Sequence, residues 1–252
     1  VLEESFAAYL NIQAMAFADG IEYETEALAE ASPVDPESVQ QFLQEHPQNF
    51  PATLLYASLL MKAKRLDEAE EVLRKLIEQV PQDDSTNGPR RMLAEIYKRR
   101  SQTDLEMQTL TEHLQRSADD LDAALRLQEL CEQQKQLDRV VELGRTIFAI
   151  DPFQSAALIR TAAAAESLGQ TDIAVSQLSS LLQIQKDDAA RLHFRIAALL
   201  KPSVPDDARR HVLLSLAQAP RYRDAHKLLL ELVAEKPKES PADEPPVPKV
   251  QE

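Results

Sequence analysis

The sequence predicts an all-α solenoid built from tandem helix-turn-helix hairpins, and three observations carry that prediction. Glycine is scarce, with 4 residues in 252, whereas sheets and nucleotide-binding loops use it freely. Prolines recur at intervals close to multiples of 34 residues. Between those prolines, apolar residues repeat at helical spacing in two successive stretches. A helical bundle without repeats is the alternative, but the shared period favours the solenoid.

The prolines mark the ends of the repeats. Pro47 and Pro81 are 34 residues apart, and Pro152 and Pro220 are 68 apart. Each repeat of about 34 residues holds a first and a second helix, joined by a short polar turn. In three of these turns we expect an aspartate to cap the second helix: Asp67, Asp138 and Asp172.

Five segments align in register, beginning at residues 50, 87, 121, 155 and 189. The first segment has a small or apolar residue at each characteristic position: Tyr56, Ala57, Leu60, Ala69, Leu73 and Pro81. This pattern resembles the tetratricopeptide repeat (TPR) family, whose unit is a helix-turn-helix of about 34 residues. The other segments are degenerate; the second places Glu106 where the family has Ala. The resemblance implies a right-handed superhelical solenoid of TPR-like hairpins whose first helices line a concave face.

The sequence divides into three regions. Residues 1–34 are expected to form an acidic N-terminal helical segment, a worn or truncated repeat with an amphipathic stretch at 2–17. Residues 35–235 form the TPR-like array, which begins with a helix capped by Asp35 and ends with a cap helix at Tyr222–Ala234. Residues 236–252 are a Pro-rich tail that we expect to be flexible.

Charge is unevenly distributed along the chain. The formal net charge is −14, and residues 1–50 hold ten Asp or Glu and no Lys or Arg. This balance disfavours nucleic acid as a partner. Apolar runs fall far short of the ~20 residues that a membrane span needs, so we expect a soluble protein without membrane insertion. A single cysteine, Cys131, leaves a cytoplasmic or a periplasmic location equally open.

Catalytic and cofactor motifs are missing from the sequence. No two glycines are closer than 25 positions, which excludes phosphate-binding loops, dinucleotide-binding loops and the nucleophile elbow. The five histidines are never three or four residues apart, so no pair has the helical spacing of metal ligands. We therefore expect no enzyme activity, no cofactor and no metal, and a buried role for Cys131.

The TPR resemblance implies which side chains face the concave groove. Carried over one position at a time, it predicts these partner-binding residues: Leu54, Ser58, Lys62, Arg91, Met92, Lys98, Arg99, Leu125, Arg126, Glu129, Ile159, Arg160 and Phe194. A row of arginines in the groove suits an acidic partner, because guanidinium groups bind carboxylates bidentately. Alternatively, the arginines pair within the protein with Glu95, Glu129 and Glu166. The family's clamp for C-terminal carboxylates also needs Asn on the first helices, and none stands at those positions.

We therefore expect a non-catalytic scaffold that binds a segment of another protein in its groove. The start at Val1 instead of Met favours a second hypothesis, in which the chain is the accessory repeat domain of a larger enzyme or a secretion or assembly machine, whose catalytic part lies upstream. Self-association is a third possibility, because the acidic N-terminal block is complementary to the basic groove of a second copy.

Overall fold

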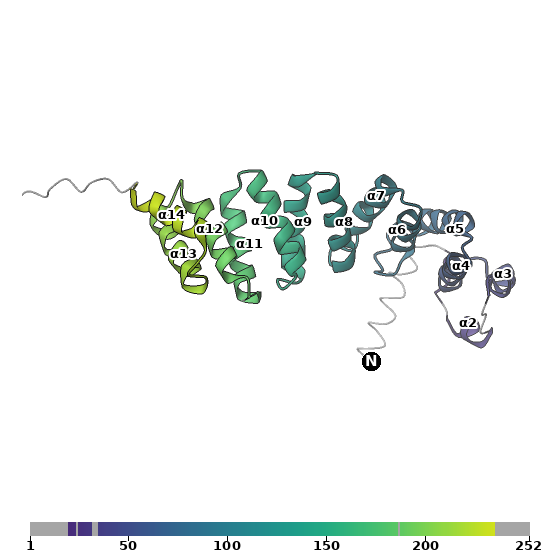
Figure 1. Ribbon diagram of the computed structural model, residues 1–252. Helices are drawn as coiled ribbons and strands as arrows, with labels where there is room; N and C mark the ends of the chain where they lie inside the picture. Colours follow the sequence, from purple (N-terminus) through teal and green to yellow (C-terminus); the bar gives the residue numbers. More distant parts are fainter. Residues whose placement is uncertain (1–19, 24, 32–34, 186, 235–252) are drawn as a thin grey trace, which may run out of the picture. The chain divides into compact units, whose positions relative to one another are not determined.

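The computed structural model describes residues 20–23, 25–31, 35–185 and 187–234. The chain divides into two compact units, Val1–Asp151 and Pro152–Glu252. In the first unit (Figure 1), the described helices are α2 (Glu26–Ala31), α3 (Pro36–Glu45), α4 (Phe50–Lys62), α5 (Leu66–Gln79), α6 (Pro89–Arg99), α7 (Thr103–Leu114), α8 (Leu121–Gln133) and α9 (Leu137–Ile150). In the second they are α10 (Ser155–Ser167), α11 (Thr171–Ile184), α12 (Ala189–Leu200), α13 (Pro205–Gln218) and α14 (Arg223–Ala234).

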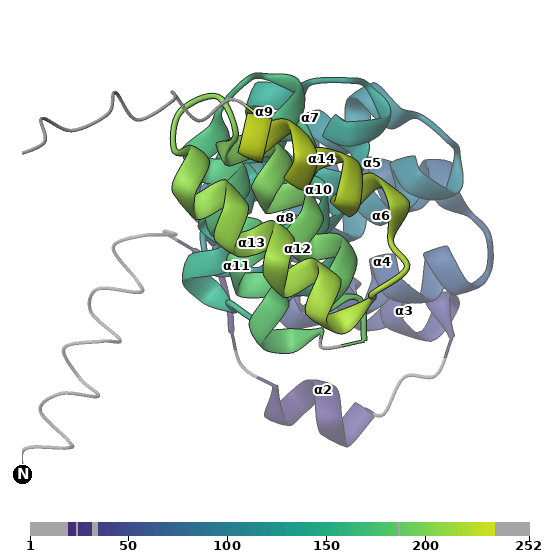
Figure 2. The ribbon, with the colours of Figure 1, turned by 60° about the vertical axis from the view of Figure 1, so that its left-hand side comes forward.

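From α3 onward, consecutive helices of each unit pack on each other, so the predicted all-α array of tandem hairpins is confirmed. Figure 2 shows α12, α13 and α14 side by side. Helices α8, α10, α12 and α14 begin at residues 121, 155, 189 and 223, at the predicted interval of 34. The predicted helix at 2–17 and the tail at 236–252 lie outside the described residues.

The turn inside each hairpin has one conformation in the first four repeats. A residue with positive φ follows the first helix in each of them: Lys64, Ser101, Lys135 and Gly169. The next residue donates its amide N–H to the carbonyl five positions back, for example from Gln136 to Cys131 at 2.9 Å. These are the features of a Schellman turn, which satisfies carbonyl groups left free at a helix end. Only one of the four turns uses glycine, which is why the family's glycine position is hard to see in the sequence.

Helix starts follow the predicted capping at some sites and not at others. Asp35 caps α3 through a reciprocal capping box with Ser38, as predicted. The prediction for the second helices was wrong, because α5 begins at Leu66 and Asp67 therefore lies in its first turn. Asp138 and Asp172 lie one position inside α9 and α11 in the same way. There these negative charges interact favourably with the positive end of the helix dipole, but they accept no capping hydrogen bond.

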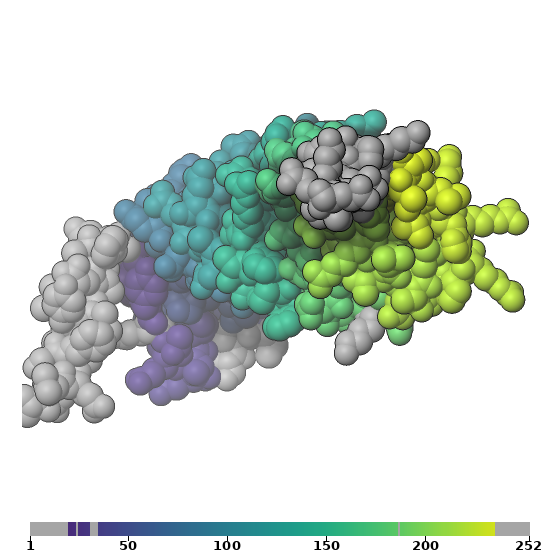
Figure 3. Space-filling model, turned by 90° about the vertical axis from the view of Figure 1, so that its left-hand side faces the viewer, coloured from purple at the N-terminus to yellow at the C-terminus, as the bar shows by residue number. Residues whose placement is uncertain are grey.

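The core is built from the small and apolar repeat positions. Ala69, Val140, Ala174 and Ala208 occupy equivalent sites on the second helices, and all four are fully buried. A small side chain there lets the two helices of a hairpin approach closely. Side chains close the gaps that the ribbon leaves between the helices of the second unit, coloured green to yellow in Figure 3. Glu106, at the equivalent position of α7, is also buried.

Candidate functional site

A cavity of about 550 Å³ lies between α4 and α6, the first helices of two successive repeats. Its lining combines apolar side chains with three cations and one carboxylate: Leu54, Leu55, Ser58, Met61, Lys62, Asn87, Arg91, Met92, Glu95 and Arg99. Six predicted groove residues therefore meet at one place. The volume falls within the range of about 300–1,000 Å³ that is usual for ligand pockets.

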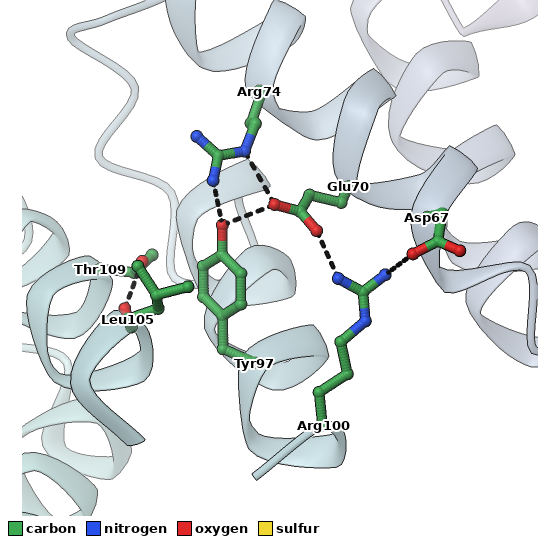
Figure 4. Close-up of polar contacts among 7 residues, drawn as sticks. All are labelled: Asp67, Glu70, Arg74, Tyr97, Arg100, Leu105 and Thr109. Carbon is green, nitrogen blue, oxygen red and sulfur yellow. Dashed lines mark hydrogen bonds and ion pairs between the residues drawn. The ribbon is translucent and has the colours of Figure 1, made fainter. Parts of the chain in front are cut away.

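A polar cluster links α6 to α5, the helix that follows α4 (Figure 4). The Tyr97 hydroxyl donates to Glu70 on α5 at 2.9 Å and accepts from Arg74 at 2.7 Å. Arg100 forms ion pairs with both Glu70 and Asp67. Burial alone would raise the pKa of Glu70, but the hydrogen bonds from Arg74, Tyr97 and Arg100 outweigh it, so this pKa is lowered. This charged clamp joins α5 to α6 and thereby fixes one wall of the cavity.

The three arginines of the first unit's groove differ in how many of their donors are already used. Arg126 donates to both oxygens of buried Glu106, at 2.7 and 3.1 Å, and to Glu129 at 2.9 Å. All three of its nitrogens are therefore engaged, and these hydrogen bonds raise the pKa of its guanidinium. Arg99 donates through Nε to Glu95 and through Nη1 to the Met61 carbonyl. The intramolecular pairing that the sequence offered as an alternative is thus seen for Arg126 with Glu129 and for Arg99 with Glu95.

Arg91 has a different environment. Its Nε lies 3.1 Å from Oδ2 of Asp120, the residue that caps α8. Among the described residues, no other ion pair or hydrogen bond is formed by Arg91, and none by Lys62. In the cavity, the ammonium of Lys62 and the two terminal nitrogens of Arg91 therefore remain available as donors to a ligand.

A smaller cavity of about 180 Å³ lies between α6, α7 and α8. Lys98 and Arg126, both predicted groove residues, line it together with Glu106, and Arg91 stands in the wall that it shares with the larger cavity. Leu125 and Glu129 on α8 are half-buried and line neither cavity.

The second unit holds the other predicted groove residues. Ile159 on α10 is 43 % exposed, whereas Arg160 beside it is half-buried. Phe194 on α12 packs against Tyr222, with ring centroids 5.0 Å apart. Glu166, considered as a partner of Arg160, forms its ion pair with Arg195 at 2.7 Å.

Sequence reasoning missed the residues that stand behind the groove. Asp120 and Glu106 are buried carboxylates that hold Arg91 and Arg126, and His113 lies 2.8 Å from Asp120. For Glu106 a signal was present, since a charged residue at a small buried repeat position requires a partner. Asn87 lines the larger cavity from the loop before α6, which the repeat positions do not include.

The described residues contain no cluster of three or more side chains that could hold a metal ion. Cys131 is fully buried, as predicted, and burial raises the pKa of its thiol. Across the described part of the chain, every helix is too short or too polar to cross a membrane.

The fold and this groove define a helical-repeat protein, a class whose stacked hairpins present extended surfaces to protein partners. Residues 37–86 match the model of the tetratricopeptide repeat family. This match covers the first of the predicted repeats, so the chain resembles the family there, in line with the degenerate repeats that the sequence predicted.

Solved structures share this fold at low sequence identity. YrrB, a TPR protein with an unusual peptide-binding site, matches with a TM-score of 0.51 and 13 % identity over 79 % of this chain and 99 % of YrrB. A chain of Naa15/Naa10 bound to HypK-THB matches with a TM-score of 0.56 and 12 % identity, over 79 % of this chain and 36 % of that chain. No curated protein sequence matches the chain. At these identities the likeness concerns the fold.

Proposed function

We propose that this protein is a non-catalytic scaffold that binds an acidic, partly apolar segment of another protein in the cavity between α4 and α6. The TPR fold supports the role as a protein-binding scaffold, and the cavity supports the assignment of the binding site to the space between α4 and α6. The carrying observation is that the Lys62 ammonium and the terminal nitrogens of Arg91 lie beside an apolar lining with no partner among the described residues, whereas all three nitrogens of Arg126 are already engaged.

The lining suits a segment that alternates apolar and acidic side chains. Leu54, Leu55 and Met92 offer apolar contact, and burial of one leucine-sized side chain contributes about 1.5–3 kcal/mol. A carboxylate beside it would meet Arg91 and Lys62 in a partly desolvated setting, where charge-assisted hydrogen bonds are strongest. A continuous polyacidic ligand is a poorer fit, because the groove charge next to the cavity is neutralised at Arg126.

Selection of peptides from a random display library on the immobilised protein tests the proposal. We expect the selected peptides to carry Asp or Glu next to Leu, Ile, Met or Phe. The double substitution Lys62→Glu with Arg91→Glu should weaken their binding at least about tenfold in calorimetry, because a charge-assisted hydrogen bond contributes roughly 1.5–3 kcal/mol.

A matched control is Lys75→Glu, which reverses an exposed charge on α5 that is paired with Glu71 outside the cavity. Peptides that bind the double variant as tightly as the Lys75→Glu control would place the binding site elsewhere.

A further inference from the structure

Asp120 is a buried carboxylate that joins three parts of the first unit. Its Oδ1 accepts the amide N–H of Ala123 at 3.0 Å and so caps α8. Its Oδ2 lies 2.8 Å from Nε2 of His113 on α7 and 3.1 Å from Nε of Arg91 on α6. The side chains of Asp120 and His113 are each 1 % exposed, and that of Arg91 is 27 % exposed. The chain of contacts therefore begins in the core and ends in the wall of the cavity.

Helix capping alone does not require a charged residue at this position. Asn and Ser cap helices about as well as Asp, because one side-chain oxygen is enough to accept the N–H. A buried carboxylate is costly unless it is paired and hydrogen-bonded. The pairing of Asp120 with Arg91 and His113 meets that cost and adds a second role to the cap.

The second role follows from the geometry of arginine. The guanidinium is planar and its donors lie in a fixed fork. Asp120 pairs with Nε of Arg91 and so fixes the orientation of the guanidinium plane. The two terminal nitrogens are then the donors that remain for a ligand. Arg91 lines both the larger and the smaller cavity, so its side chain stands in the wall between them.

We propose that Asp120, supported by His113, is a positioning residue that presents the terminal nitrogens of Arg91 to a single side-chain carboxylate of the bound segment. This inference rests on the proposed function and states its specificity. The bound segment carries one Glu or Asp between apolar residues, and Arg91 binds that carboxylate while Asp120 fixes the orientation of its guanidinium. The apolar lining binds the neighbouring side chains, and the positioned guanidinium distinguishes a carboxylate from an amide.

The tripeptide N-acetyl-Leu-Glu-Leu-amide and its Gln counterpart are suitable probes, with binding followed by NMR titration of the whole chain. For the wild-type protein we expect a preference for the Glu peptide of about tenfold. Asp120→Asn keeps a capping oxygen but removes the charge, and should reduce the preference to about threefold or less. Asp35→Asn, a cap substitution on α3, is the matched control and should leave the preference unchanged.

A second variant tests the positioning role without changing the residue that caps α8. Arg91→Lys keeps a positive charge, but an ammonium drawn to Asp120 cannot also offer a fixed fork to the ligand. It should lose the preference in the same way as Asp120→Asn. If the wild type prefers the Glu peptide and both variants keep that preference, the positioning role is overturned while the proposed function stands. If the wild type binds neither peptide or binds both equally, the proposed acidic specificity is overturned as well.

Discussion

The guanidinium of Arg126 donates to both carboxylate oxygens of Glu106, at 2.7 and 3.1 Å, and Glu106 occupies a buried position where the repeat pattern places alanine. The pair therefore places a buried carboxylate, matched by Arg126 on α8, at a position where other repeats bury a small side chain. It also uses the donors of an arginine that the sequence alone would assign to the groove. The donors left for a ligand are thereby the Lys62 ammonium and the terminal nitrogens of Arg91.

Restoring the repeat pattern with Glu106→Ala should destabilise the protein. Removal of one partner leaves Arg126 with Glu129 alone, and the partial exposure of Arg126 limits the cost to about 1–3 kcal/mol in urea unfolding. Glu106→Ala combined with Arg126→Met should lose less than the two single changes together, since no uncompensated charge remains. Additive losses in this double-mutant cycle would show that the pair is energetically unimportant.

The positive φ of 55° at Lys135 predicts a stabilising substitution. A side chain in the left-handed region is strained, and glycine relieves the strain at some cost in unfolded-state entropy. Lys135→Gly should therefore stabilise the protein by about 0.5 kcal/mol in thermal unfolding. The reverse change at the equivalent turn, Gly169→Ala, should destabilise it. As a control, Lys75→Gly inside α5 should cost about 1 kcal/mol; equal effects at both lysines would argue against turn strain as the cause.

The Tyr97 hydroxyl is the link between Arg74 and Glu70, and Tyr97→Phe removes only that group. We expect a loss of about 1 kcal/mol in the free energy of unfolding, because a carboxylate loses a donor in a partly buried site. Tyr56→Phe, at a half-buried tyrosine on α4, is the comparison and should change stability by less. A Tyr97→Phe protein as stable as the wild type would mean that Arg74 and Arg100 satisfy Glu70 without the hydroxyl.

A pair of histidines in the second unit predicts a dependence of stability on pH. Nδ1 of His193 on α12 lies 3.0 Å from Nδ1 of His211 on α13. Burial lowers the pKa of both below the usual 6.5, with His211 adding to the shift at His193 and Arg210 at His211, while Asp207 opposes it at His211. As pH falls below 6.5 the unfolded chain takes up protons that the folded chain does not, so stability should decrease.

Melting temperatures measured from pH 7.5 down to pH 5.5 would show this decrease. His193→Gln should flatten the pH dependence, whereas His226→Gln, at an exposed histidine on α14, should not. A wild-type profile with the same slope as that of His193→Gln would rule out the pair as its source.

The repeat period and the succession of helices could be predicted from the sequence because they depend on local patterns. Apolar spacing specifies each helix, and small residues such as Ala69 and Ala174 specify where helices approach. The capping role of Asp67 was assigned wrongly, since a shift of one residue at a helix start depends on how the turn closes. Such boundaries are the least reliable part of any sequence reading.

The sequence by itself determined the kind of protein: an all-α repeat protein without a phosphate loop, whose repeat positions predict which face of each first helix binds a partner. Only the tertiary structure decided which donors of the predicted groove arginines remain available to a ligand. That choice depends on Asp120 and Glu106, which lie 29 and 20 positions along the chain from Arg91 and Arg126. Helical periodicity places residues on a face, whereas the pairing of charges depends on distances between helices, and those arise only when the hairpins pack.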